Sequence, residues 1–422
     1  MENKRVPEVR FEGFSEDWEE RKLGDFIKSM HGGASIAPDD YQEEGVSTVP
    51  KGAVNYSGIA NLSGSKFVSE GFYQKNIKAS VYSGDLVTSL RDLVPTAPNM
   101  GRIVKLLGES KKYLMPQGVY RLLLEEGVDE NFMIAFSNSD KFRKIISQGK
   151  NGSTQVHIRN SEYLGIKLKA PNSKEQTKIG TFFKQLDDAI ALHQHELTTL
   201  KQTKQGFLQK MFPKEGESVP EVRFSGFTGD WEQRKLREML AEPVTDGPHE
   251  TPKLEESGIP FISVDAIVDN QIDFDRKRGY ISEETDELYS KKYRPQYHDV
   301  FLVKSGSTVG KTAIVETKER FNIWSPLAAM RVGEVSDPYF LYFLLQTRKM
   351  QNQVKDKASS GTQPNLGMRE LEKFHTQITP NLEEQKKIGA FFQQLDNLIT
   401  LHQRELEALK KTKKAFLQKM FV

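Results

Sequence analysis

The stretch "EQTKIGTFFKQLDDAIALHQHELTTLKQTKQGFLQKMF", residues Glu175–Phe212, contains a long periodic pattern and no proline. Positions spaced alternately by 4 and 3 residues run from Ile179 to Met211, and almost all of them are apolar. A 3.5-residue repeat held over this length predicts a helix whose apolar seam packs on another helix at coiled-coil geometry. Such a helix would be roughly 50 Å long, at ~1.5 Å per residue, and Pro213 would end it.

The same stretch returns at Glu384–Phe421 as "EQKKIGAFFQQLDNLITLHQRELEALKKTKKAFLQKMF", identical at 26 of 38 positions. Neither helix could bury its seam on its own surface, so the other copy is its natural partner. Spacing alone leaves parallel and antiparallel packing both open. The predicted seam comprises Ile179, Phe183, Leu186, Ile190, Leu197, Leu200 and Phe207, with Ile388, Phe392, Leu395, Ile399, Leu406, Leu409 and Phe416 in the second copy.

Four polar residues interrupt this seam at equivalent places in the two copies: His193 and Lys204, then His402 and Lys413. Metal-ligand spacing is missing around the histidines. Lone polar seam residues more often set the register of a helix pair than bind ligands. We therefore expect these four to fix the alignment of the helices, and we predict no metal site.

A second repeat precedes each helix. "PEVRFEGFSEDWEERKL" (Pro7–Leu23) and "PEVRFSGFTGDWEQRKL" (Pro220–Leu236) are identical at 13 of 17 positions. The chain therefore consists of an opening segment, a variable segment and a long helix, followed by the same three parts again. This predicts a domain at residues 1–174, a helix at 175–212, a second domain at 213–383 and a second helix at 384–422.

The variable segments mix strand and helix patterns. The alternating stretches 118–127 and 301–316 are typical of strands and turns, whereas 129–147 and 337–354 predict helices, with Asp129 and Asp337 as their caps. Each variable segment has about 150 residues, which is long enough to fold alone. We predict an α+β protein: two mixed α/β domains, a pair of long helices and internal pseudo-twofold symmetry.

Composition narrows the functional classes. The 422 residues carry a net charge of only +2 and no cysteine, which excludes disulfides, thiolate catalysis and cysteine metal sites. Apolar runs stay short of the ~18 residues that a membrane helix needs. The N-terminal residues lack an apolar signal region, so we expect a cytoplasmic protein with no membrane partner. With such a balanced charge, binding to nucleic acid would have to depend on local basic patches.

Two polar, basic stretches occupy similar places in the two variable segments, around residues 141–160 and 347–369. Arginine and lysine can contact phosphates or guanine, and glutamine and asparagine can read adenine. The glycine-rich turn at 305–312 adds lysines and hydroxyls suited to a DNA backbone. The predicted DNA-binding residues are Arg91, Asn99, Arg102, Lys150, Asn151, Ser153, Thr154, Gln155, His157 and Arg159, then Lys304, Ser305, Ser307, Thr308, Lys311, Lys357, Ser360, Thr362, Gln363 and Asn365.

The second variable segment contains two patterns that suggest other functions. "SGSTVGKT" (305–312) has Ser305 where a phosphate-binding loop needs glycine, and its context is strand–turn–strand rather than strand–helix. Asp299, Glu316 and Lys318 fit the loose D…E-x-K pattern of magnesium-dependent nucleases. That pattern arises easily by chance in a chain rich in glutamate and lysine. A self-sufficient DNA nuclease therefore remains the alternative hypothesis.

Taken together, the repeats resemble the DNA-specificity subunit of type I restriction-modification enzymes. The two long helices are similar to the conserved helices of that family, the two opening segments to those before its target-recognition domains, and the "STQ" and "GTQ" turns to the ends of those domains. The resemblance covers essentially the whole chain.

The resemblance implies that each variable domain reads one half of a split double-stranded DNA target. It also implies that the two helices pack antiparallel as a spacer and dock two methyltransferase subunits, which motor-nuclease subunits then join. The chain itself would have no catalytic residues and no cofactor. S-adenosylmethionine, Mg and ATP would belong to the partner subunits in a bacterial cytoplasm.

Overall fold

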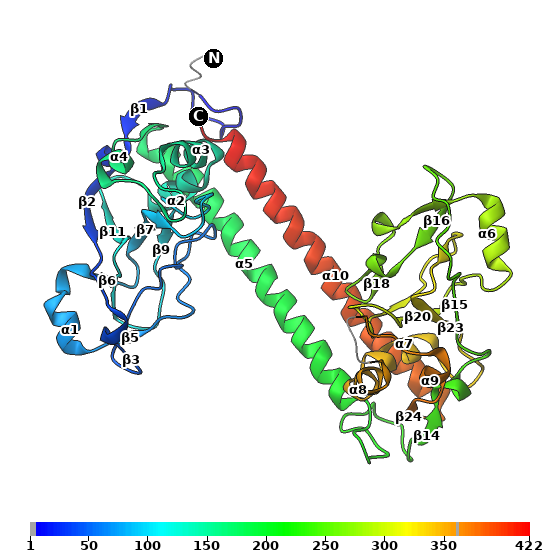
Figure 1. Ribbon diagram of the computed structural model, residues 1–422. Coiled ribbons are helices and arrows are strands. Elements are labelled where there is room, and N and C mark those ends of the chain that lie inside the picture. The colour runs from blue at the N-terminus through cyan, green and yellow to red at the C-terminus, as the bar shows by residue number, and fades with distance from the viewer. Residues whose placement is uncertain (1–5, 360–362) are drawn as a thin grey trace. The chain divides into compact units, whose positions relative to one another are not determined.

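The structure is a computed structural model that describes residues 6–359 and 363–422. The chain forms two compact units, Met1–His195 with Gln403–Val422, and Glu196–His402. Each unit therefore contains part of both long helices, α5 (Ser173–Lys210) and α10 (Leu382–Lys419), which have 38 residues each (Figure 1). The predicted α+β class with two long helices is confirmed.

The first unit contains a four-stranded antiparallel sheet in the order β2-β11-β7-β9, surrounded by short two- and three-stranded ladders. Its strands are β1 (Glu19–Lys22), β2 (Ile27–Gly32), β3 (Tyr41–Gln42), β4 (Val46–Ser47), β5 (Phe67–Val68), β6 (Ser80–Tyr82), β7 (Leu86–Ser89), β8 (Arg91–Asp92), β9 (Ile103–Lys105), β10 (Lys112–Leu114), β11 (Val119–Leu124), β12 (Val156–His157) and β13 (Lys167–Ala170). Its shorter helices are α1 (Glu70–Lys75), α2 (Glu130–Asn138), α3 (Asp140–Gly149) and α4 (Asn160–Leu164).

The second unit repeats the plan, with a four-stranded antiparallel sheet in the order β15-β23-β20-β21. Its strands are β14 (Glu232–Lys235), β15 (Thr245–Asp246), β16 (Ile259–Ile262), β17 (Ile267–Val268), β18 (Gln271–Ile272), β19 (Gly279–Ile281), β20 (Val300–Val303), β21 (Thr312–Ile314), β22 (Asn322–Ile323), β23 (Leu327–Met330) and β24 (His375–Ile378). Its shorter helices are α6 (Glu283–Ser290), α7 (Pro338–Gln346), α8 (Arg348–Lys357) and α9 (Met368–Glu372).

Within the first unit, the N-terminal part of α5 packs antiparallel on the C-terminal part of α10. Phe182 meets Phe416 edge to face with ring centroids 5.0 Å apart, and Asp187 forms a close ion pair with Lys413. Residue numbers thus rise along α5 while they fall along α10. The polar seam residue Lys413 has a carboxylate partner, which fits its expected role in register.

Within the second unit, the remaining parts of the two helices meet in the same way. Phe207 packs edge to face on Phe391 at 5.1 Å, and the Lys204 ammonium lies 2.7 Å from the Asp396 carboxylate. The seam prediction left the direction of the helices open, and these contacts identify them as antiparallel in each unit. The two lysine–aspartate pairs are equivalent. In the first unit α5 supplies the aspartate and α10 the lysine, whereas in the second unit α5 supplies the lysine and α10 the aspartate.

None of the predicted seam residues is fully exposed. Those with less than one tenth of their surface exposed are Ile179, Phe183, Ile388, Phe392, Ile399 and Leu406. The rest of the predicted seam is half-buried. The outer faces of the helices are polar. In the described part of the chain, residues 6–359 and 363–422, none of the helices is long and apolar enough to cross a membrane.

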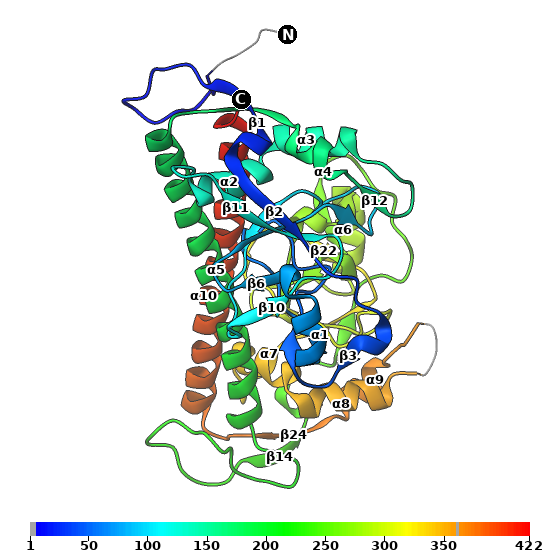
Figure 2. The same ribbon diagram turned by 90° about the vertical axis from the view of Figure 1, so that its left-hand side faces the viewer.

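The C-terminal residues of the chain complete the core of the first unit. Phe421 packs against Trp18, Phe132 and Phe183, with ring centroids 5.7–6.4 Å apart. The backbone N–H of Val9, in the opening segment, donates to the last turn of α10 at 3.1 Å. Figures 1 and 2 both show this end of α10 beside α3.

The second unit contains the equivalent core, completed by the end of α5. Phe212 packs against Trp231, Phe340 and Phe392, with ring centroids 5.4–6.2 Å apart. Each opening segment therefore packs on the long helix that ends in its own unit. In both units the tryptophan of this segment is buried, as a packing residue should be.

The helices predicted over 129–147 and 337–354 begin at the expected caps, since the carboxylates of Asp129 and Asp337 accept backbone N–H bonds three residues on. Both stretches are helical as predicted, and each is divided into two helices. Ser139 and Thr347 break the runs, because their hydroxyls accept the N–H of Phe142 and Met350 and so cap a second helix.

Candidate DNA-reading surfaces

In the first unit, two predicted DNA-binding stretches that are far apart in sequence lie side by side. Strand β8 pairs antiparallel with β12, which places Arg91 opposite His157. Backbone bonds of 2.8 and 2.9 Å join Asn151 to His157 and close the turn between them. Gly152 has a φ of +101°, and a Cβ there would lie 2.2 Å from the Gln155 carbonyl oxygen, so only glycine fits this turn.

A cavity of about 410 Å³ opens beside this strand pair. Lys51 and five further lining residues have side-chain polar groups with no hydrogen-bond partner in the described part of the chain. We call the five other than Lys51 the first reader surface: Arg91, Asn99, Gln117, Gln155 and His157. Arginine suits guanine, and asparagine and glutamine suit adenine, in the major groove. Gln117 was not predicted, because its glycine-flanked position between strands carries no recognisable pattern. Ser153, Thr154 and Arg159 are exposed near this turn.

Two predicted DNA-binding cations of the first unit bond to its own backbone instead. The Arg102 guanidinium donates to the Pro98 carbonyl at 2.9 Å, and burial lowers the pKa of Arg102. The Lys150 ammonium donates to the Pro95 carbonyl at 2.6 Å. Both side chains face a loop of the protein, so they have fewer donors left for phosphates.

In the second unit, the glycine-rich turn between β20 and β21 lies against the stretch at 363–366. Ser305 bridges to Asn365, and the Gly306 N–H donates to the Pro364 carbonyl at 3.0 Å. We call Ser305, Ser307, Thr308, Lys311 and Asn365 the second reader surface. Lys311, Lys357 and Gln363 are exposed, whereas Ser360 and Thr362 lie outside the described residues.

Lys304 differs from the other predicted residues of this turn. It is buried, and its ammonium lies 3.3 Å from the carboxylate of Asp246, which is fully buried. A buried lysine without that partner would pay a large desolvation penalty. The sequence contains a hint of this, since Lys304 directly follows the four buried residues of β20.

The nuclease alternative gains no support from the geometry of Asp299. Both carboxylate oxygens of Asp299 are occupied, by Arg331 at 2.8 Å, by the Tyr293 hydroxyl at 2.6 Å and by the Gln296 N–H at 2.8 Å. Its side chain is only 1% exposed. A carboxylate saturated in this way has little capacity left to coordinate a cation.

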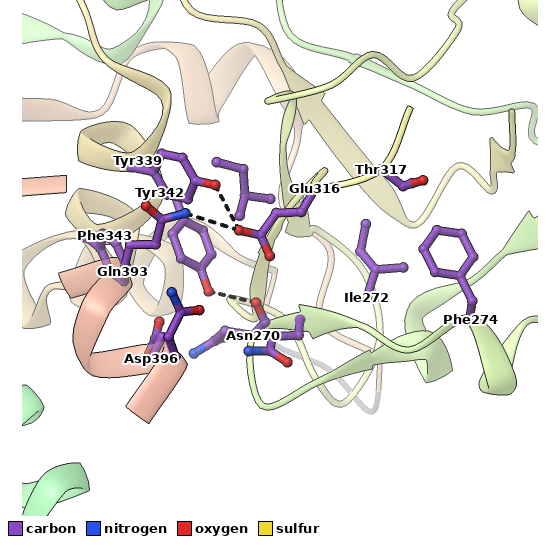
Figure 3. A pocket seen from close by; sticks show the side chains of 13 residues that line it. Asn270, Ile272, Phe274, Glu316, Thr317, Tyr339, Tyr342, Phe343, Gln393 and Asp396 are labelled. Atoms are coloured by element: carbon purple, nitrogen blue, oxygen red, sulfur yellow. Dashed lines mark hydrogen bonds between the residues drawn. The ribbon is translucent and has the colours of Figure 1, made fainter. Parts of the chain in front are cut away.

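Glu316, the second carboxylate of that pattern, has a different set of partners. It accepts a hydrogen bond from the Tyr339 hydroxyl at 2.8 Å and a longer one from Gln393 of α10 at 3.5 Å (Figure 3). These residues line a cavity of about 200 Å³ between the β-rich part of the second unit and α10. Glu316 therefore connects the second unit's sheet to its part of the helix pair.

Comparison with known proteins identifies one family over both halves of the chain. Residues 15–202 and 228–411 match the family described as "Type I restriction modification DNA specificity domain". The chain is 26% identical over 434 residues to the type I restriction enzyme MjaVIII specificity subunit of Methanocaldococcus jannaschii, covering 98% of this chain and 92% of that protein. It is 30% identical over 210 residues to the putative MjaX specificity subunit of the same organism, covering 49% and 48% of the two chains.

Two solved structures share the fold. The crystal structure of the S subunit of a type I restriction-modification system from M. genitalium superposes with a TM-score of 0.66 at 14% identity, over 99% of both chains. A structure concerned with complex assembly and conformational transition of the type I system superposes with a TM-score of 0.51 at 17% identity, over 95% of this chain and 96% of that chain. The chain belongs to the family of type I restriction-modification DNA specificity subunits.

Proposed function

We propose that this chain specifies a bipartite DNA sequence for partner enzymes, each unit reading one half of it. One observation carries this proposal: the two units share a repeated frame but present dissimilar polar surfaces at equivalent places. The frame repeats the sheet order and the aromatic core. The first reader surface is rich in amides and the second in hydroxyls, although each includes an asparagine and a cation. Two unlike readers on one frame suit an asymmetric, split target.

The first reader surface supports base recognition more than phosphate binding. Its residues combine one guanidinium with three amides and an imidazole, and these groups are unbonded within the described chain. Hydrogen-bonding groups that have no partner in the free protein are available to base edges. The second reader surface is richer in hydroxyls and in backbone turns, which suits contacts to the sugar–phosphate chain as well as to bases.

The partners are also part of the proposal. The two long helices would set the distance between the half-sites and dock two methyltransferase subunits, to which motor-nuclease subunits are added. Adenine methylation and cleavage would then occur in those partners, which would bind S-adenosylmethionine, Mg and ATP. The chain itself would recognise DNA without catalysing a reaction, in the bacterial cytoplasm where the DNA lies.

The test is methylome sequencing of the host with and without this chain. Loss of methylation at one split motif is the expected result. A second experiment exchanges residues 24–174 for the corresponding segment of another family member. Only one half of the motif should then change. A change in both halves, or magnesium-dependent cleavage of DNA by the purified chain that is lost in Glu316→Gln, would contradict the proposal.

A further inference from the structure

The loop that joins β7 to β9 in the first unit presents two apolar side chains to solvent. Leu93 and Val94, which are neighbours in the loop, are 67% and 47% exposed. Leu93 also lines the cavity that holds Arg91 and Gln117 of the first reader surface. Exposed apolar residues are common on proteins, so the interest of this pair lies in its position beside the polar groups of the first reader surface.

The loop is fixed from within by one carboxylate. Asp92 accepts the backbone N–H of Val94 with one oxygen and that of Asn99 with the other, both at 3.0 Å. The Ala97 N–H closes a further turn on the Val94 carbonyl at 2.8 Å. Asp92 thus ties the two ends of the loop together and fixes the backbone that carries Leu93.

Three cations brace the same loop from the protein side. Arg143, Arg102 and Lys150 all donate to its backbone carbonyls, and burial lowers the pKa of Arg143 to about 10. The bonds run from Arg143 to Ala97 and Met100, from Arg102 to Pro98 and from Lys150 to Pro95, over 2.6–2.9 Å. A loop ordered in this way gives up little conformational entropy when it meets a ligand.

The equivalent loop of the second unit lacks these features. The strands β7 and β9 match β20 and β21 in sheet order, and the connecting loops are residues 90–102 and 304–311. The shorter loop is the glycine-rich turn "KSGSTVGK", which contains no leucine. The exposed apolar pair therefore lies beside the first reader surface and has no counterpart in the equivalent loop of the second unit, as expected for a feature that contributes to specificity.

We propose that Leu93, supported by Val94, contacts the 5-methyl group of a thymine in the major groove of the first half-site. This inference rests on the proposed function. The side chains around Leu93 are those that read guanine and adenine edges in the major groove, and the thymine methyl is the apolar group displayed there. Minor-groove binders instead insert leucine as a wedge between base steps, and the fluorescence measurement described below distinguishes that arrangement from a methyl contact.

The experiment uses the chain purified with its methyltransferase subunits and the motif found by methylome sequencing. Each thymine of the motif is replaced in turn by uracil, which removes only the methyl group, and the affinity is measured. For the wild type, one replacement in the first half-site should weaken binding by roughly three- to five-fold. In Leu93→Ala the same replacement should have no further effect.

Two controls make the result specific. Leu123→Ala removes a leucine that is 47% exposed on β11 and does not line the cavity, so it should retain the wild-type response to uracil. Uracil replacements in the second half-site should act equally on wild type and Leu93→Ala. Thermal unfolding of Leu93→Ala should match the wild type, because the side chain is exposed.

Several results would overturn the inference. These are a first half-site without thymine on either strand, or a uracil effect that persists in Leu93→Ala. Another is a rise in 2-aminopurine fluorescence that depends on Leu93 while uracil has no effect, since that would identify a wedge. In each of these cases the split motif is still bound and the proposed function stands. Failure of the wild-type complex to bind any split motif would defeat both.

Discussion

The Arg10 guanidinium donates to both carboxylate oxygens of Glu175, each at 2.7 Å, and so joins the opening segment to the first turn of α5. Arg223 and Glu384 repeat the pair in the second unit, at 2.7 and 2.9 Å. The two glutamate side chains are 1% and 0% exposed. Each pair connects parts of the chain that are more than 160 positions apart.

We predict that Arg10→Met destabilises the first unit by about 3–5 kcal/mol, because it leaves a buried carboxylate without its counter-ion. Hydrogen exchange read separately for the two units would measure this. Protection should fall in the first unit and stay unchanged in the second, and Arg223→Met should give the reverse. Equal losses in both units would show that the pairs do not act locally.

The ion pair between Asp187 and Lys413 predicts a different result. Burial raises the pKa of Asp187, although the neighbouring ammonium lowers it, so ionising this carboxylate is costly. Lys413→Met should therefore destabilise the first unit by about 3–5 kcal/mol, whereas the double variant Asp187→Leu/Lys413→Met should recover most of that loss. Denaturant unfolding of the two single variants and the double variant gives the coupling energy. Strict additivity would contradict the prediction.

Phe421 provides a prediction about connectivity. Phe421→Ala should destabilise the first unit by about 3–5 kcal/mol, since it removes a buried ring from that core. Phe212→Ala should do the same to the second unit. Limited proteolysis with mass spectrometry would identify the unit that opens. If Phe421→Ala opened the second unit instead, the assignment of the C-terminal residues to the first core would be wrong.

The sequence predicts the two long helices but not which unit's core contains the end of each helix. The 3.5-residue repeat predicts both helices and their seam because a helix seam depends on local spacing. The shared "KMF" ending is equally clear, at Met211–Phe212 and Met420–Phe421. The local sequence does not show which domain core each of these endings packs into. That depends on whether the two helices run parallel or antiparallel.

Similar limits apply to the reader surfaces. The caps Asp129 and Asp337 were predictable, because capping is local chemistry. The side-chain bonds of Arg102 and Lys150 were not, because their partners are backbone carbonyls of one loop, 4 and 55 positions away, and the fold of that loop decides whether the carbonyls face these side chains. A basic residue in a polar stretch can bind phosphate or brace a loop, and only the fold distinguishes these roles.

His298 predicts a pH dependence for the second unit. Its ring centroid lies 4.0 Å from that of Tyr297, with the two rings tilted by 32°, and burial lowers the pKa of His298 below 6.5 despite the nearby carboxylates of Asp337 and Glu316. A lowered folded-state pKa means that the unfolded chain takes up the proton first. The free energy of unfolding should therefore fall as the pH drops below about 6.5.

His298→Asn should remove this contribution, because asparagine does not titrate and tolerates the φ of +74° found here. Denaturant unfolding at several pH values between about pH 7 and pH 5 would test it. The variant should lose less stability across that range than the wild type. Parallel curves for the two proteins would assign the pH dependence to other groups.

Arg91 and Lys311, one cation from each reader surface, should affect DNA binding in different ways. Arg91 lines the cavity of the first reader surface, and Arg91→Ala should relax the preference at one base pair of the first half-site by about 1–3 kcal/mol. Lys311 is exposed on the second reader surface, where a phosphate contact would be insensitive to sequence. Lys311→Ala should weaken binding to all sequences alike and reduce the slope of log K against log salt by about 0.9.

Binding of motif variants at several salt concentrations, by the chain purified with its methyltransferase subunits, separates the two effects. Lys304→Met serves as a comparison, since that lysine is buried against Asp246. It should lower the stability of the second unit and leave the salt slope unchanged in the protein that remains folded. A change in base preference from Lys311→Ala, or a purely uniform loss from Arg91→Ala, would reverse the assigned roles, because base contacts carry sequence information and phosphate contacts do not.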